Sequence, residues 1–151
     1  MIEKLKSLFT LTVGEDNQLL AANQEQTKWL AAAALMVEII AVDDEEHAAE
    51  KAMLTRLLSE RFEIDALGAE ALIKQAEAAH NEATDFYRFT AEINDAFDAD
   101  EKIGLIESLW QLAYADGHIH ELEQHVIRKL ASLLYVSHKD FIAAKLRVTQ
   151  A

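Results

Sequence analysis

The chain contains no cysteine and no proline, and only four of its 151 residues are glycine. Without cysteine it can form no disulfide bond, thiolate zinc site or iron–sulfur cluster, and it has no cysteine nucleophile. Proline and glycine interrupt helices and build tight turns, so their scarcity favours long helices joined by few turns. No stretch alternates apolar and polar residues for long enough to predict a strand. At this length we expect a single all-α domain.

Positive charge is also scarce. There are 14 Lys and Arg residues against 27 Asp and Glu, which gives a net charge of −13. Nucleic acids and anionic membranes both attract basic surfaces, and the sequence has no basic run. We therefore expect neither kind of partner. The acidity is compatible with solubility, with a basic partner protein or with bound cations.

A long hydrophobic run is missing as well. The most apolar stretch, residues 30–42, includes Glu38 and is shorter than the ~20 residues that a membrane-spanning helix needs. It predicts a buried core helix instead. At the N-terminus, Lys4 and Lys6 precede a short apolar patch without a small-residue cleavage site, unlike a secretory signal. We expect a cytoplasmic protein that does not insert into membranes.

The hydrophobic periodicity predicts seven to eight helices. Residues 1–24 are expected to form a short helix (residues 2–9) and a loop, and residues 25–151 the helical domain. The helices of this domain are expected over about residues 25–42, 47–61, 65–80, 84–97, 98–115, 120–135 and 137–150. Their starts are marked by potential N-cap residues: Asn23 (with Gln26), Asp65, Asp98 (with Glu101) and Ser137 (with Asp140).

Sliding the chain by 73 residues reveals an internal repeat. Residues 35–62 then align with residues 108–135, with matching apolar positions. Three of the identical pairs are polar residues at a predicted helix junction: Asp43 with Asp116, His47 with His120, and Glu50 with Glu123. We expect two related three-helix units, about residues 25–80 and 98–150, bridged by the helix over residues 84–97. A pseudo-two-fold arrangement of these units would bring the two junctions together.

The second junction carries a short motif between two predicted helices. An Ala-Asp-Gly-x-Ile/Val-x-x-x-Glu junction in an acidic helical chain resembles the TerB-like family, named for bacterial tellurite-resistance protein B. The first junction departs from this pattern, because Asp43 is followed by Asp44 rather than glycine and Glu46 stands in the place of isoleucine. The residues that carry the resemblance are Ala115, Asp116, Gly117, Ile119 and Glu123.

The resemblance implies a compact fold of two helical pseudo-repeats with an acidic pole suspected of binding a divalent metal. It further implies a role in stress or tellurite-type resistance systems, or in contact with a partner protein. The family brings no defined reaction with it. The partner remains unnamed, and a homodimer is one possibility.

The junction residues allow two interpretations. In the first they only build helix ends: Gly117 takes the left-handed conformation, Glu123 reaches back to the amide of His120, and Asp116 accepts N–H groups of the next helix. In the second they bind a divalent cation. Carboxylates from Asp116, Glu123, Asp43 and Glu50 would suit Ca²⁺ or Mg²⁺, whereas His120, His47 and His118 would suit Zn²⁺ or another transition metal better. The candidate cations are thus Ca²⁺, Mg²⁺, Mn²⁺ and Zn²⁺.

Other chemistry is weakly specified. The sequence has no glycine-rich phosphate loop and no recognisable nucleophile motif, so we do not expect an enzyme, although an acid–base pair in an acidic cleft is a third hypothesis. Glu77 and His80 have the i, i+3 spacing of di-iron bundles, but no good second pair exists, and we expect them on a solvated helix surface. The aromatic residues expected in the core are Trp29, Trp110, Phe86, Phe89, Phe97, Phe141 and Tyr135.

Overall fold

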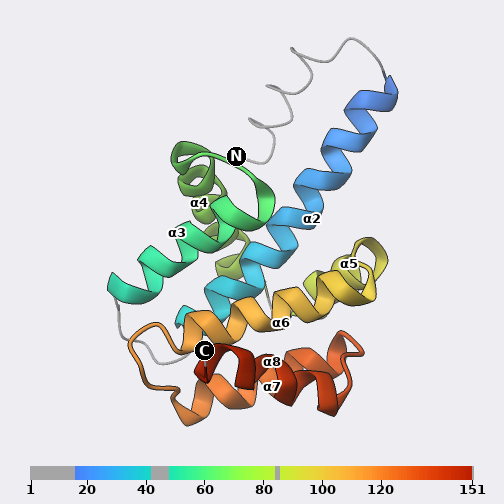
Figure 1. Ribbon diagram of the computed structural model, residues 1–151. Helices are drawn as coiled ribbons and strands as arrows, with labels where there is room; N and C mark the ends of the chain where they lie inside the picture. Colours follow the sequence, from blue (N-terminus) through green and yellow to red (C-terminus); the bar gives the residue numbers. More distant parts are fainter. Residues whose placement is uncertain (1–15, 42–47, 84–85, 151) are drawn as a thin grey trace.

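The computed structural model describes residues 16–41, 48–83 and 86–150, and within these ranges it contains seven helices and no strand (Figure 1). The prediction of an all-α fold is therefore confirmed. In the described part of the chain, no helix has the length and apolar character needed to cross a membrane. The helices are α2 (Asp16–Ala41), α3 (Ala48–Phe62), α4 (Ala66–Glu82), α5 (Tyr87–Ala96), α6 (Ala99–Ala113), α7 (Glu121–Leu133) and α8 (His138–Thr149).

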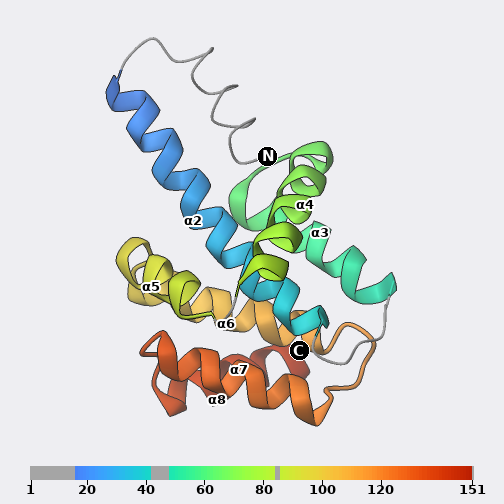
Figure 2. The ribbon, with the colours of Figure 1, turned by 180° about the vertical axis from the view of Figure 1, so that it is seen from behind.

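Helix α2 is the central element. It packs against α3, α4, α5, α6 and α7, and its first turns extend beyond the other described helices (Figures 1 and 2). Four consecutive alanines, Ala31 to Ala34, are fully buried, so this part of α2 is surrounded on every side. Small side chains around the whole helix allow neighbouring helices to approach closely. The sequence-based prediction of a buried central helix is confirmed.

The start of α2 differs from the expectation. Asn23 was expected to cap this helix after a loop, but the helix begins at Asp16 and Asn23 lies inside it. The expected loop contains Leu19, Leu20 and two alanines, which are good helix formers, and no proline stops the helix from extending. The short helix expected over residues 2–9 lies outside the described residues.

The two predicted repeats are present as α2–α3–α4 and α6–α7–α8, with α5 between them. Helix α3 begins at Ala48 and α7 at Glu121, which is the expected offset of 73 residues. Equivalent positions are buried in both helices, including Glu50 with Glu123 and Leu57 with Leu130. The third helices begin at residues 66 and 138, an offset of 72, so the register slips by one residue in the preceding loop.

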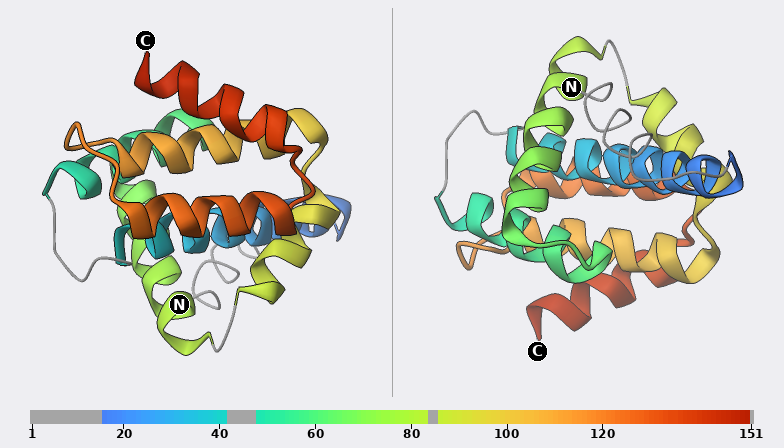
Figure 3. Two further views of the ribbon diagram at one scale, coloured as in Figure 1. Left: turned by 90° about the horizontal axis from the view of Figure 1, so that it is seen from below. Right: turned by 90° about the horizontal axis from the view of Figure 1, so that it is seen from above.

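Contacts between the repeats follow the same offset. The ammonium group of Lys28 on α2 lies 2.6 Å from a carboxylate oxygen of Glu101 on α6, and these two positions are 73 residues apart. A direct contact between equivalent residues is what a pseudo-two-fold axis passing between α2 and α6 produces. Both helices end at the same end of the molecule in all views (Figures 1, 2 and 3).

The aromatic residues show how the repeats have diverged. Trp29 stacks on Phe62 with ring centroids 5.3 Å apart. At the equivalent positions of the second repeat, Lys102 lies over the ring of Tyr135 at 5.8 Å. Tyr135 is 82% exposed, so the expectation that it belongs to the core is wrong. It follows the end of α7 in a left-handed conformation (φ 59°), which turns its side chain away from the core.

Arg61 joins the end of α3 to α6. Its Nε donates a hydrogen bond to the hydroxyl of Ser108, and burial lowers the pKa of its guanidinium group. A Cβ on Gly104 would lie 2.9 Å from Nη1 of Arg61, so glycine leaves the space that this side chain occupies. The absence of a side chain at Gly104 therefore makes room for the Arg61 guanidinium group at this contact between α3 and α6.

Candidate functional site at the helix junctions

The loop between α6 and α7 is shaped by Asp116 and Gly117. Gly117 has a φ of +85°, the left-handed conformation expected for it, and its N–H donates to the carbonyl of Tyr114 at 2.8 Å. The carboxylate of Asp116 accepts the N–H of His118 at 3.0 Å. We expected Asp116 to accept N–H groups of the next helix, but α7 begins only at Glu121, so among the described residues Asp116 closes the loop instead.

Glu123 occupies the first turn of α7 and is completely buried. Its Oε1 accepts the backbone N–H of His120 at 3.3 Å, so its expected role at the helix start is confirmed. The positive end of the helix stabilises negative charge at this position. The side chain is thus held by the backbone of the same junction that contains Asp116.

Three polar side chains of this junction lie close together. Nε2 of His120 is 3.7 Å from Oδ2 of Asp116, and the rings of His118 and His120 are in edge-to-face contact with centroids 4.8 Å apart. The junction therefore presents one carboxylate and two imidazoles within a single loop, beside the buried carboxylate of Glu123. Imidazole nitrogen and carboxylate oxygen are both ligands for transition metals.

The first junction can be compared only in part. Glu50 in the first turn of α3 is 1% exposed, which matches the burial of Glu123 at the equivalent position. Asp43 and His47 lie outside the described residues. Within residues 16–41, 48–83 and 86–150, no three Asp, Glu or His side chains are arranged to hold a metal ion. The predicted site combines both junctions, so it remains a prediction.

Glu38 and His80 form a pair that the sequence analysis missed. Nε2 of His80 on α4 lies 2.5 Å from a carboxylate oxygen of Glu38 on α2, and both side chains are about one-sixth exposed. The His80 ring also stacks against Phe86. We expected His80 on a solvated surface, which is wrong. Glu38 stands out as a charge within an apolar run, but nothing in the sequence indicates a partner 42 residues away.

Comparison with known proteins assigns the chain to a family. The model for tellurite resistance protein TerB matches residues 29–146, which is most of the chain and includes both junctions. No curated protein and no solved structure matches the chain. The match agrees with the all-α fold described above. The chain belongs to the TerB family.

Proposed function

We propose that this chain is a divalent-cation-binding, metal-responsive protein-interaction module of a bacterial stress or tellurite-resistance-type system. Its site would lie at the end of the molecule where α2 and α6 both end (Figure 1). The observation that supports this proposal is the pair Glu50 and Glu123, which hold equivalent positions in the two repeats and are 1% and 0% exposed.

Burial of carboxylates in both repeats has a physical cost. Removing a carboxylate from water is unfavourable unless hydrogen bonds, a helix N-terminus or a cation compensates for the lost hydration. In a chain with a net charge of −13, a bound divalent cation would also relieve repulsion among the acidic side chains. The cation would draw oxygen ligands from Asp116, Glu123, Asp43 and Glu50, and nitrogen ligands from His120 and His47.

The first test is thermal unfolding of chelator-stripped protein with Ca²⁺, Mg²⁺, Mn²⁺ or Zn²⁺. A metal at ~100 times its dissociation constant stabilises the folded state by ~2.7 kcal/mol, which at this chain length raises the midpoint by ~5–10 °C. We expect one of the four metals to produce such a shift, and Asp116→Asn and Glu123→Gln to reduce it. Glu121→Gln is the matched control, because Glu121 is an exposed carboxylate in the same turn of α7.

A metal-independent interaction domain is the second candidate function. It is favoured by the hydrogen bond from the N–H of His120 to Oε1 of Glu123, which gives this carboxylate a structural role at the start of α7. No thermal shift with any of the four metals would support this candidate and contradict the first. A thermal shift that is unchanged in both variants would show that the cation binds elsewhere than at the junctions.

A further inference from the structure

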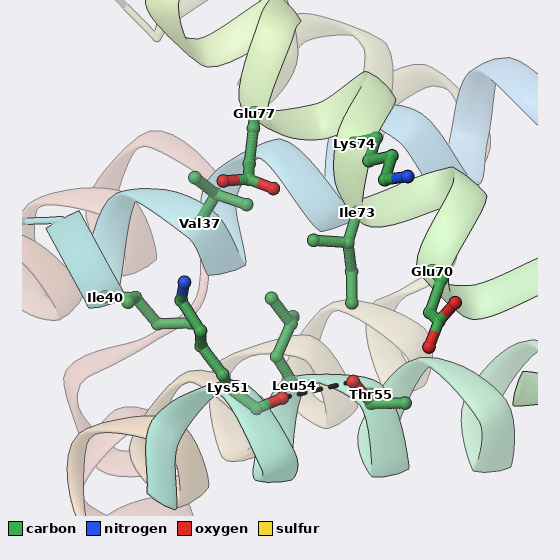
Figure 4. A pocket seen from close by; sticks show the side chains of 9 residues that line it. All are labelled: Val37, Ile40, Lys51, Leu54, Thr55, Glu70, Ile73, Lys74 and Glu77. Atoms are coloured by element: carbon green, nitrogen blue, oxygen red, sulfur yellow. Dashed lines mark hydrogen bonds between the residues drawn. The ribbon is translucent and has the colours of Figure 1, made fainter. Parts of the chain in front are cut away.

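A cavity of about 240 Å³ opens between α2, α3 and α4 (Figure 4). Its apolar walls come from one or two residues of each helix: Val37 and Ile40 of α2, Leu54 of α3 and Ile73 of α4. A closed apolar cavity of about 150 Å³ is enough to hold a benzene molecule. The space in this chain therefore accommodates one aromatic ring, but it is smaller than the 300–1,000 Å³ typical of sites for whole drug-sized ligands.

Charged side chains surround the mouth of this cavity. Lys51 comes from α3, and Glu70, Lys74 and Glu77 come from α4. Figure 4 shows the carboxylate of Glu77 beside Val37, turned toward the cavity. Within the described residues, neither Glu70 nor Glu77 takes part in an ion pair. The mouth therefore carries two lysines and two glutamates, and its carboxylates are available to a cationic group on whatever enters.

The second repeat shows what fills the same space there. Val37 corresponds to Trp110, whose side chain is fully buried and donates from its indole nitrogen to the carbonyl of Phe141 at 3.3 Å. In the third helices the offset is 72 residues, so Ile73 of α4 corresponds to Lys145 of α8. The ammonium group of Lys145 lies 5.4 Å from the centre of the Trp110 ring. The same ammonium group donates to the side chain of Gln124, the counterpart of Lys51, at 3.1 Å. The second repeat thus closes this position with its own indole and a cation above it.

We propose that the α2–α3–α4 cavity receives one aromatic side chain of a partner polypeptide, with a lysine or arginine of that partner next to it. The aromatic ring would take the place that the Trp110 indole holds in the other repeat. The neighbouring cation would pair with Glu77 or Glu70 at the rim, in a position comparable to that of Lys145 above Trp110. Buried aromatic anchors in fitted pockets dominate the affinity of many protein interfaces.

The overall charge of the chain favours the same kind of partner. A net charge of −13 attracts a basic segment and repels a second copy of this chain. A free ring-sized molecule would gain only the contacts within the cavity, whereas a polypeptide adds contacts along the rim. The cavity shares no lining residue with the predicted cation ligands, so a partner can bind there whether or not a metal binds at the junctions.

The test uses the full chain and the capped peptide Lys-Trp-Lys as the probe, in a buffer of physiological ionic strength. Binding is measured by chemical-shift changes of backbone amides in ¹⁵N-labelled protein. We expect saturable changes at Val37, Leu54 and Ile73, and at least tenfold weaker binding of the capped peptide Lys-Ala-Lys. Equal binding of the two peptides would overturn the proposal, because it would show attraction by charge alone.

Two variants close the cavity from opposite walls. Val37→Trp supplies from α2 the residue that the second repeat uses, and Ile73→Trp supplies an indole from the partly exposed face of α4. We expect either change to weaken Lys-Trp-Lys binding at least tenfold while circular dichroism shows a folded protein. If one variant fails to fold, the other still decides, and unchanged binding to a folded variant would overturn the proposal.

Two further comparisons test the chemistry of the occupant. The double change Glu70→Gln and Glu77→Gln is expected to weaken Lys-Trp-Lys binding at least threefold, whereas Glu82→Gln, which removes a carboxylate from α4 outside the cavity, is not. An equal effect of both would overturn the role of the rim carboxylates. Free indole is expected to bind at least tenfold more weakly than the peptide, and an equal dissociation constant would overturn the assignment to a polypeptide.

Discussion

Three residues of the described structure have a left-handed backbone, and they differ in what this conformation costs. Gly117 adopts it without a Cβ, whereas Glu63 (φ 53°) and Tyr135 (φ 59°) each carry one. For residues other than glycine the conformation costs roughly 1–2 kcal/mol. Glu63 and Tyr135 both follow a helix end, where backbone hydrogen bonds to the last turn compensate: the N–H of Val136, for example, donates to the carbonyl of Ala131 at 2.9 Å.

Gly117→Ala isolates the cost of this backbone conformation. A Cβ at Gly117 would have no atom within 4 Å, so the substitution introduces strain but no clash. We expect the free energy of unfolding to fall by ~1–2 kcal/mol in urea denaturation. Gly117→Asn should lose less, because asparagine tolerates the left-handed region better. Equal losses for the two variants would show that the loop, rather than the φ angle, determines the effect.

At the scale of the helix, a start could be predicted where a capping side chain bonds the backbone a few residues further along the chain. Asp65, Asp98 and Ser137 all cap helices as expected, because each bonds an N–H three residues ahead. The beginning of α2 was predicted wrongly, since Asn23 and Gln26 have the spacing of a capping box inside a continuous helix. A local motif marks a helix start only where nothing upstream continues the helix.

The capping box of α6 provides a prediction at this scale. Oδ1 of Asp98 accepts the N–H of Glu101 at 2.7 Å, and Oε1 of Glu101 accepts the N–H of Asp98 at 3.0 Å. Asp98→Ala removes the first of these bonds, and we expect a loss of ~1 kcal/mol in the free energy of unfolding. Asp95→Ala removes an exposed carboxylate from the C-terminal turn of α5, where the helix dipole does not favour negative charge. We expect this change not to destabilise the protein. Thermal or urea unfolding of both variants measures the difference.

At the scale of the whole molecule, the duplication is the part of the architecture that the sequence carries most clearly. The repeat offset predicted two three-helix units, because buried positions such as Glu50 and Glu123 keep their spacing in both copies. Pairs that hold different elements together, such as Glu38 with His80 or Arg61 with Ser108, have no local pattern and no counterpart in the other repeat. The candidate site was predictable in its residue types and spacing, but the role of Asp116 within its loop depends on where α7 begins.

The ion pair between Lys28 and Glu101 should make the free energy of unfolding depend on pH in the acidic range. The hydrogen bond from Lys28 lowers the pKa of Glu101, with a smaller contribution from the backbone of Asp98. A carboxyl group whose pKa is lower in the folded state stabilises the protein above its unfolded pKa of about 4.3. That contribution is lost as the pH falls through the folded pKa. For an exposed pair we expect it to be ~0.2–1 kcal/mol.

Glu101→Gln tests this expectation through unfolding measured between about pH 6 and pH 3. The variant should be less stable than the parent at pH 6, and the difference should shrink as the pH falls. Glu60→Gln is the control, because Glu60 pairs with Arg56 inside a single helix and does not join the repeats. A difference between Glu101→Gln and the parent that stays constant over this pH range would contradict the assigned cause.

The interiors of the two repeats are filled by side chains of unequal size. The rings of Trp110 and Phe141 pack in a tilted arrangement within the second repeat, with centroids 5.1 Å apart, where the first repeat has Val37, Ala69 and an open cavity. Side chains that line a void lose part of their van der Waals contact, so equal numbers of helices do not contribute equal cohesion. We therefore expect local opening to involve α3 and α4 before α6 to α8. The duplicated unit has in this way become asymmetric, because the cavity lies in the first copy and a buried tryptophan fills the equivalent place in the second.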